Sequence, residues 1–214
     1  MKDIHNNLNN ILHKIKKIAN KDVKLIVVTK KQSIQDIEQA IEAGACEFAE
    51  NYVQEALTKW QSLKIKYPYI KLHLIGHLQH NKIKKALAFF DVIQTLDSIT
   101  LAESIAAKLP VNHNISFFIQ VNLDPKKTHG VTLDNLNNLV EHCKKLKLPI
   151  IGLMGILPHN LANTENYFQI LAKLNRKYNF PELSMGMSSD YLQAITWGAT
   201  MVRLGKAVFN GEDE

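Results

Sequence analysis

Short apolar runs alternate with longer amphipathic stretches through most of this chain. A leading stretch, residues 3–20, comes first. Its isoleucines and leucines recur every three or four positions, as in a helix with one buried face. After it, apolar runs of about four to eight residues are each followed by a stretch with helical spacing. This alternation predicts βα units, in which successive strands lie parallel in one sheet.

The apolar runs define eight candidate strands, at residues 25–29, 47–50, 72–76, 92–96, 117–122, 150–155, 183–186 and 201–205. Helical stretches follow the first seven of them, at residues 33–44, 51–65, 79–89, 98–109, 132–147, 163–178 and 189–197. Eight strands in this order favour an α/β fold, a closed (β/α)8 TIM barrel, over an open doubly wound sheet. We therefore expect one domain over residues 1–214, with the leading helix before a barrel at residues 22–210.

The composition suits a barrel that does not enter a membrane. The chain has 214 residues, within the range of a compact barrel, and 46% of them are hydrophobic. No run approaches the roughly 20 apolar residues of a membrane span, and residues 1–7 lack the apolar region of a secretory signal. The two cysteines, Cys46 and Cys143, form no CxxC pair, which is typical of structural thiols in a reducing compartment. We therefore expect a cytoplasmic protein.

The net charge of +6 allows three kinds of partner: nucleic acid, an anionic surface or a small anionic ligand. The densest lysine clusters, at residues 14–17 and 82–85, alternate with core-type apolar residues. This arrangement favours solvated faces of amphipathic helices, so we expect no nucleic-acid partner. A nucleic-acid or protein-interaction module that uses these basic helices remains an alternative.

Polar residues stand where several predicted strands end, which is where such barrels carry their chemistry. Lys30 follows the first strand, and burial there would lower its pKa and supply a neutral amine able to attack an aldehyde. Arg203 and Gly205 end the last strand, and residues 184–189 are mainly small. A nucleophilic lysine, an arginine and small residues suited to a phosphate together indicate pyridoxal 5′-phosphate (PLP) as the ligand.

Six segments, taken in order, resemble the single-domain PLP-binding proteins of the YggS/PROSC type, also called PLP homeostasis proteins. They are Val-Val-Thr-Lys at 27–30 and the segments 49–55, 73–82, 152–154, 183–188 and 201–205. The resemblance runs from about residue 22 to the C-terminus. It implies a barrel like the N-terminal domain of alanine racemase and a bound PLP cofactor.

The resemblance also implies roles for individual residues. Lys30 would hold PLP as a Schiff base, a covalent aldimine, and Arg203 would face the pyridine nitrogen. Ser188 and the backbone amides around Gly205 and Lys206 would hold the phosphate. The full set of predicted cofactor-binding residues is Lys30, Asn51, Ser184, Gly186, Ser188, Arg203, Gly205 and Lys206.

The chain departs from the family pattern at several positions near these residues, including 31–33, where Lys-Gln-Ser replaces a common Thr-Lys-Pro. Thr29 replaces a serine before the lysine, and Ala49 stands where glycine is usual. Lys206 stands where a small residue or threonine is frequent, so a hydroxyl contact there is lost. A lysine can contact phosphate as a point charge instead.

The residues favour a carrier of PLP over an enzyme. Arg203 stays charged and donates hydrogen bonds, so a ring nitrogen facing it stays unprotonated and the ring is a weak electron sink. Racemisation also needs an acid or base opposite Lys30, which racemases take from a further C-terminal domain, whereas this sequence ends at Glu214. Tyr52 is the nearest candidate, but its place at a helix start favours a structural role.

We therefore expect a monomer that acts in intracellular PLP homeostasis, stores PLP and delivers it to apo PLP-dependent enzymes, with no robust catalysis. A low-activity, PLP-dependent amino-acid racemase is the alternative.

Three histidines in one segment raise the question of a metal. His73, His77 and His80 are spaced four and three residues apart, but a predicted strand-to-helix junction falls among them. They therefore do not share one helix face, as ligands on a helix would. The sequence predicts no metal site.

Overall fold

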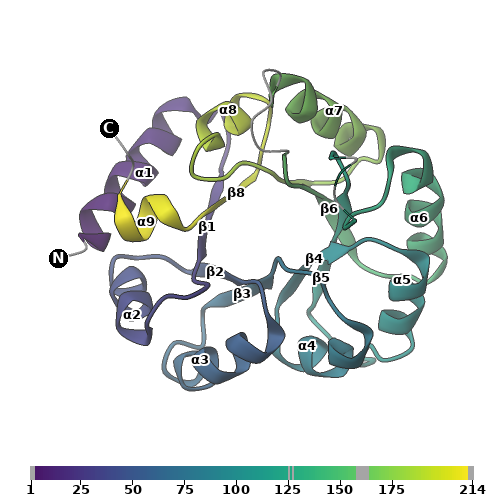
Figure 1. Ribbon diagram of the computed structural model, residues 1–214, viewed down its shortest axis with the longest axis horizontal. Coiled ribbons are helices and arrows are strands. Elements are labelled where there is room, and N and C mark those ends of the chain that lie inside the picture. Colours follow the sequence, from purple (N-terminus) through teal and green to yellow (C-terminus); the bar gives the residue numbers. More distant parts are fainter. Residues whose placement is uncertain (1–2, 125, 127, 158–163, 212–214) are drawn as a thin grey trace.

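The computed structural model is a closed barrel of eight parallel strands, and it describes residues 3–124, 126, 128–157 and 164–211. The strands are β1 (Lys24–Val28), β2 (Glu47–Glu50), β3 (Lys71–Leu74), β4 (Val92–Leu96), β5 (Ser116–Val121), β6 (Ile150–Gly155), β7 (Glu182–Ser184) and β8 (Met201–Leu204). Each strand pairs with the next along the chain, and β8 pairs with β1 to close the ring, as Figure 1 shows. The expected (β/α)8 fold with an extra N-terminal helix is confirmed.

Helices surround this ring on the outside (Figure 1). They are α1 (Ile4–Ile18), α2 (Ile34–Glu42), α3 (Val53–Lys66), α4 (Ile83–Phe89), α5 (Ile99–Ala106), α6 (Leu133–Lys145), α7 (Thr164–Lys177), α8 (Tyr191–Thr196) and α9 (Lys206–Asn210), with a short 3-10 helix, η1 (His80–Lys82), before α4. Among the described residues, no helix is both long and apolar enough to cross a membrane.

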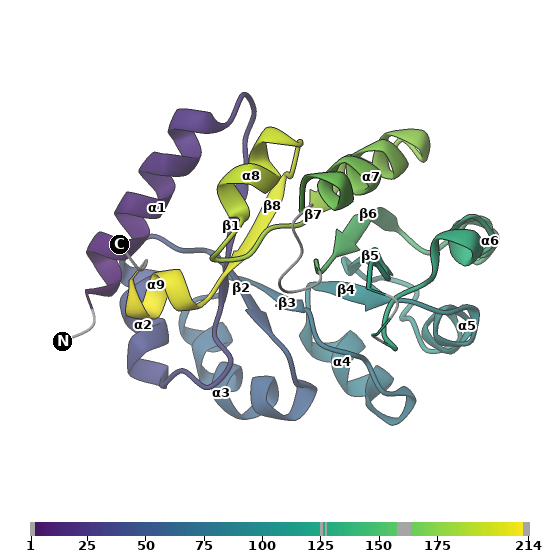
Figure 2. The same cartoon turned by 45° about the horizontal axis from the view of Figure 1, so that its top comes forward.

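The leading helix, α1, packs on the outer wall of the barrel against α2, α8 and α9. Figure 2 shows it beside α8 and α9, so the first and last helices of the chain lie next to each other. Asp3 accepts a hydrogen bond from the backbone N–H of Asn6 at 3.1 Å, which satisfies one free donor at the helix start. Asn7 donates to the carbonyl of Val208 at 3.0 Å. This contact fixes α9, which follows the last strand at the rim of the barrel.

Alternate strand residues form two separate apolar clusters, because successive side chains of a strand point to opposite faces of the sheet. The larger cluster packs between the sheet and the helices, and Val27 and Phe48 belong to it. The smaller cluster fills the inside of the barrel and includes Ile26, Ala49 and Phe118. Each strand therefore contributes one set of residues to the helix layer and the other set to the barrel interior.

The seventh strand is shorter than the pattern predicts and ends at Ser184 rather than Gly186. Gly186 has φ +95°, a left-handed conformation that other residues rarely adopt. A Cβ on this glycine would also lie 2.7 Å from Cβ of Ala194 in α8. The chain therefore turns at Gly186, and the residues after it leave the sheet to form the rim.

Candidate functional site

Six of the eight predicted cofactor-binding residues line one cavity at the carboxyl ends of the strands. The cavity has a volume of about 490 Å³. The six residues are Lys30, Asn51, Ser188, Arg203, Gly205 and Lys206. The other two, Ser184 and Gly186, lie behind this lining: Ser184 is fully buried beneath Arg203, and the carbonyl of Gly186 accepts a hydrogen bond from the Arg203 backbone.

Lys30 lies in a tight turn directly after β1. Gln32 donates its backbone N–H to the carbonyl of Thr29 at 3.0 Å, so Lys30 and Lys31 occupy the middle of the turn, and Lys31 takes φ +61°. Thr29 is fully buried, whereas the side chain of Lys30 is exposed. The expectation that Lys30 is buried is therefore wrong, because the turn lifts the residue out of the strand.

A buried ionic network holds this turn from behind. Lys59 of α3 donates to the carbonyl of Thr29 at 2.6 Å and pairs with Glu50 at 2.7 Å and Glu55 at 2.8 Å. The same oxygen of Glu50 also accepts hydrogen bonds from Thr29 Oγ1 at 2.7 Å and from Trp60 Nε1 at 3.1 Å. The backbone that carries Lys30 is thus anchored to both β2 and α3.

Arg203 projects from β8 into the barrel and is buried. Its guanidinium donates to Ser184 Oγ at 2.7 Å and to the carbonyl of Gly155 at 2.8 Å. Burial lowers the pKa of Arg203 to about 10, although the negative charge of Asp190 acts in the opposite direction. Arg203 therefore remains a charged donor at neutral pH, and two of its donor groups are already occupied by protein.

A chain of hydrogen bonds runs from Arg203 across the barrel interior to β2. Arg203 can only donate, so Ser184 accepts from it and donates to Gln94 Oε1 at 2.7 Å. The amide of Gln94 then donates to Nδ1 of His73 at 2.9 Å, and Nε2–H of His73 donates to Glu47 at 3.0 Å. These contacts fix the orientation of Arg203 from four other strands.

Sequence reasoning assigned Gln94 no role in the site and considered His73 only as a metal ligand. The signal for both is a polar residue at an inward-facing position of an otherwise apolar strand. Which polar residues meet depends on the register between β3, β4 and β7, and one sequence does not provide that register.

The carboxylate at the end of this chain predicts a pH effect on stability. Burial acts to raise the pKa of Glu47, but the hydrogen bond from His73 and the charges of Lys24 and Lys71 outweigh it, so the pKa is lowered from 4.5. The resulting stabilisation is present above pH 4.5 and is lost as the pH falls through the folded-state pKa. Urea unfolding at decreasing pH should show this loss in the wild type and a smaller loss in Glu47→Gln.

Glu103 offers the matched control for this measurement. It contacts His142 at 3.1 Å, nearly the distance between Glu47 and His73, but its side chain is 54% exposed. Glu103→Gln should keep the wild-type dependence of unfolding free energy on pH. An equal change in both variants would show that burial of the Glu47 pair has no special effect.

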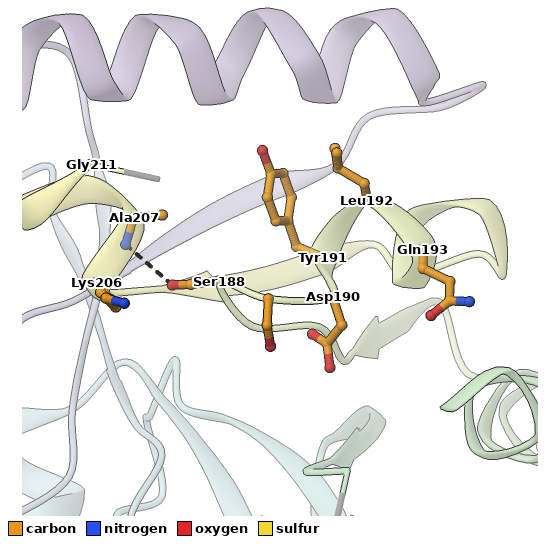
Figure 3. A pocket seen from close by; sticks show the side chains of 9 residues that line it. Ser188, Asp190, Tyr191, Leu192, Gln193, Lys206, Ala207 and Gly211 are labelled. Carbon is orange, nitrogen blue, oxygen red and sulfur yellow. Dashed lines mark hydrogen bonds between the residues drawn. The ribbon is translucent and has the colours of Figure 1, made fainter. Parts of the chain in front are cut away.

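The side of the cavity formed by β7 and β8 is rich in backbone and hydroxyl groups. Ser188 Oγ accepts a hydrogen bond from the backbone N–H of Ala207 at 3.3 Å, drawn as the dashed line in Figure 3. Gly205 approaches β1 so closely that a Cβ there would lie 3.1 Å from the carbonyl oxygen of Val28. Ser188 and Lys206 also line an adjoining cavity of about 530 Å³, the one in Figure 3.

The opposite side of the cavity is formed by Asn51. A Cβ on Gly76 would lie 1.9 Å from the backbone oxygen of Asn51, so only glycine allows the loops after β2 and β3 to pack this closely. The side-chain oxygen Oδ1 of Asn51 is buried and has no hydrogen-bond partner among the described residues. A buried acceptor without a donor is unfavourable, so this atom is suited to accept a hydrogen bond from a bound molecule.

The family described as "Alanine racemase, N-terminal domain" matches residues 4–213 of this chain. Two relatives, each called "Pyridoxal phosphate homeostasis protein", come from Haemophilus influenzae and Synechocystis. The first is 34% identical, over 99% of this chain and 97% of the relative, and the second is 38% identical, over 87% and 90%. The chain belongs to the family of pyridoxal phosphate homeostasis proteins.

Solved structures agree with this assignment. PipY of Synechococcus elongatus, solved with PLP bound, has a TM-score of 0.85 and 31% sequence identity, and the match covers 97% of this chain and all of PipY. Alanine racemase from E. faecalis has a TM-score of 0.75 at 13% identity, over 97% of this chain and 58% of the racemase. The likeness to the racemase concerns the fold alone.

Two of the residues expected to depart from the family pattern, Thr29 and Ala49, fit the structure of this chain. Thr29, in place of serine, keeps a hydroxyl and uses it to bond Glu50 and the carbonyl of Ala49. Ala49 is fully buried in the barrel interior, where its methyl group packs with Ile26 and Phe118. Neither residue therefore disturbs the turn that carries Lys30.

Proposed function

We propose that this chain binds PLP in the 490 Å³ cavity and acts in intracellular PLP homeostasis, storing the cofactor and delivering it to other proteins. The observation that carries the proposal is that Lys30, Arg203 and Ser188 line the same cavity. PLP supplies an aldehyde, a basic ring nitrogen and a phosphate, and each of these three residues matches one of those groups.

In this proposal Lys30 holds the cofactor covalently. Its Nζ condenses with the aldehyde of PLP to a Schiff base, and one water molecule is released. The turn over residues 29–32 presents the exposed amine to the cavity, while the Lys59 network keeps the backbone of that turn in place. Asn51 Oδ1, which has no partner among the described atoms, accepts a hydrogen bond from the bound cofactor.

Arg203 faces the ring nitrogen and donates to it. Because Arg203 remains charged at neutral pH, it keeps that nitrogen unprotonated. The hydrogen bonds from Arg203 to Ser184 and Gly155 hold the guanidinium in one orientation. Ser188, the backbone around Gly205 and the ammonium of Lys206 bind the phosphate, with Lys206 acting as a point charge.

Storage and delivery fit the site better than turnover. An unprotonated ring stabilises a carbanion poorly, and racemisation also requires a second acid or base across from Lys30. Tyr52, the candidate from the sequence, is 66% exposed and lines a neighbouring cavity rather than the one that contains Lys30. The six predicted binding residues that line the cavity belong to one chain, so we propose a monomer, and we also propose that it acts in the cytoplasm.

Transfer of PLP to a PLP-free enzyme tests the proposal. The protein is loaded with PLP, freed of excess cofactor and mixed with an apo-aminotransferase whose activity then reports PLP received. We expect reactivation of the apo-enzyme and a matching loss of PLP absorbance from the carrier. A loaded protein that releases PLP to no acceptor would contradict a role in delivery.

A low-activity racemase is the second candidate, favoured by the barrel shared with alanine racemase and by Arg203, which lines the same cavity as Lys30. It predicts exchange of the α-hydrogen of an amino acid with solvent deuterium in the presence of the loaded protein. Absence of exchange across a panel of amino acids would exclude it.

A further inference from the structure

A second group of ligand-bearing side chains lies at the same rim, beside the cavity described above. His77 follows β3, Asp97 follows β4 and His129 precedes α6, so three different loops contribute to it. The ligand atoms of these three residues all lie within 4.8 Å of one another. His73 and His80 take no part, because His73 bonds Gln94 inside the barrel and His80 bonds Ser104.

Side-chain hydrogen bonds do not account for this grouping. Nδ1 of His77 and Oδ2 of Asp97 are 3.9 Å apart, too far for a hydrogen bond. The rings of His77 and His129 are stacked with their centres 4.5 Å apart. Three strong ligand groups thus face one another without bonding directly.

Hydrogen bonds to backbone groups hold the loops that carry His77 and His129. Thr95 donates to the carbonyl of Gly76 at 2.9 Å, which ties the residue before His77 to β4. Val131 donates to Gln120 and accepts from Asn122, both at 2.8 Å, so the segment with His129 is held against the end of β5. The backbone positions of His77 and His129 are therefore set by contacts with the strands of the barrel.

The carboxylate of Asp97 has its own support. The backbone N–H of Gly130, the residue after His129, donates to Asp97 Oδ2 at 3.2 Å. Ligands of bound metals are commonly held by such an additional hydrogen bond, which orients them. The side chain of Asp97 is 12% exposed and that of His77 is 42% exposed, so the group is open to solvent on one side.

We propose that His77, Asp97 and His129 bind a divalent zinc ion. Two imidazoles and one carboxylate are typical zinc ligands, and three protein ligands with an open fourth position are the usual set in reactive zinc sites. Zinc bonds of about 2.1 Å place two ligand atoms of a tetrahedral ion about 3.4 Å apart. The ligand atoms now lie within 4.8 Å of one another, so binding requires the stacked imidazoles of His77 and His129 to reorient toward the carboxylate.

His77 and His129 line a cavity of about 450 Å³, so an ion bound by them would border this cavity. Asn51, Ile75 and Ile156 border both this cavity and the one that contains Lys30. The proposed ion site therefore adjoins the cavity that contains Lys30. The proposal departs from the expectation of no metal site, which considered only histidines close together in sequence.

Titration of untagged protein with Zn²⁺ in a calorimeter tests the proposal. We expect one site per chain, weakened at least about tenfold in His77→Ala, His129→Ala and Asp97→Asn. His80→Ala is the matched control, since His80 is exposed on the same rim but bonds Ser104, and it should bind Zn²⁺ as the wild type does. Bound Co²⁺ provides a second readout through its visible absorption.

Lys30→Ala separates this proposal from PLP binding, because it should lose the covalent PLP adduct and keep the metal. Three results would overturn the zinc site: no binding at micromolar protein, a loss in His80→Ala equal to that in His77→Ala, or a loss of Zn²⁺ binding together with the covalent PLP adduct in Lys30→Ala.

Discussion

Replacing Lys30 by alanine is expected to remove all PLP that borohydride can trap on the protein. The wild type mixed with PLP should develop a visible band, and reduction should attach the cofactor to the peptide that contains Lys30. Alanine has no amine, so the band and the trapped adduct disappear together. Contacts to the ring and phosphate remain, so PLP should still bind without a covalent bond, about 100-fold more weakly, which corresponds to ~2.7 kcal/mol.

The adjacent residue supplies the control for this experiment. Lys31 is also exposed, but it lies one position further along the turn and does not line the cavity. Lys31→Ala should therefore keep the band and the trapped adduct. Equal trapping in Lys30→Ala and in the wild type would show that another lysine carries the cofactor, and Lys206 would then be examined first because it lines the same cavity.

The architecture was predictable because short apolar runs alternate along the sequence with longer stretches of helical spacing. Strands β2, β4 and β6 have the predicted bounds, and the other strands differ from prediction by one or two residues at their ends. The differences have local causes, such as the positive φ of Gly186 that ends β7 early. Each helix has one apolar face and each strand is apolar on both faces. Strands of this kind belong to parallel sheets that are covered on both sides, as in a closed barrel.

The site was predictable only where chain order alone brings residues together. The rule that chemistry lies at strand ends selects Lys30 and Arg203, and closure of the barrel places both on one rim. The exposure of Lys30 was not predictable, because it depends on a turn rather than on the strand. The meeting of His77 with His129 depends on the path of the loop after β5, for which the hydrophobic pattern gives no signal.

Replacing Lys59 by methionine is expected to have the largest effect on stability of any single change near the site. Glu50 is fully buried and Lys59 is 12% exposed. Methionine would fill the space of the lysine stem but leave the carboxylate of Glu50 without a counter-ion. Breaking such a buried pair on one side destabilises a protein by about 3–5 kcal/mol. Urea unfolding at neutral pH measures this loss.

A second substitution tests whether the uncompensated charge is the cause. Glu50→Gln keeps an acceptor for Thr29 and Trp60 but carries no charge. The double variant Glu50→Gln/Lys59→Met should therefore be more stable than Lys59→Met alone, which is the coupling that a double-mutant cycle detects. A double variant that loses the sum of both single losses would attribute the effect to packing instead.

The exposed pair of Lys66 and Glu38 separates burial from distance. Its two charged groups are also 2.7 Å apart, but the side chain of Lys66 is 59% exposed and water screens the interaction. Lys66→Met should leave the unfolding free energy nearly unchanged although its ion pair is as short as the buried one. Lys59 also donates to the carbonyl of Thr29, so in Lys59→Met the turn that presents Lys30 loses its support from α3. We therefore expect Lys59→Met to retain PLP less well than the wild type. Equal losses of unfolding free energy in Lys59→Met and Lys66→Met would mean that the ionic network behind Lys30 acts as an ordinary surface ion pair.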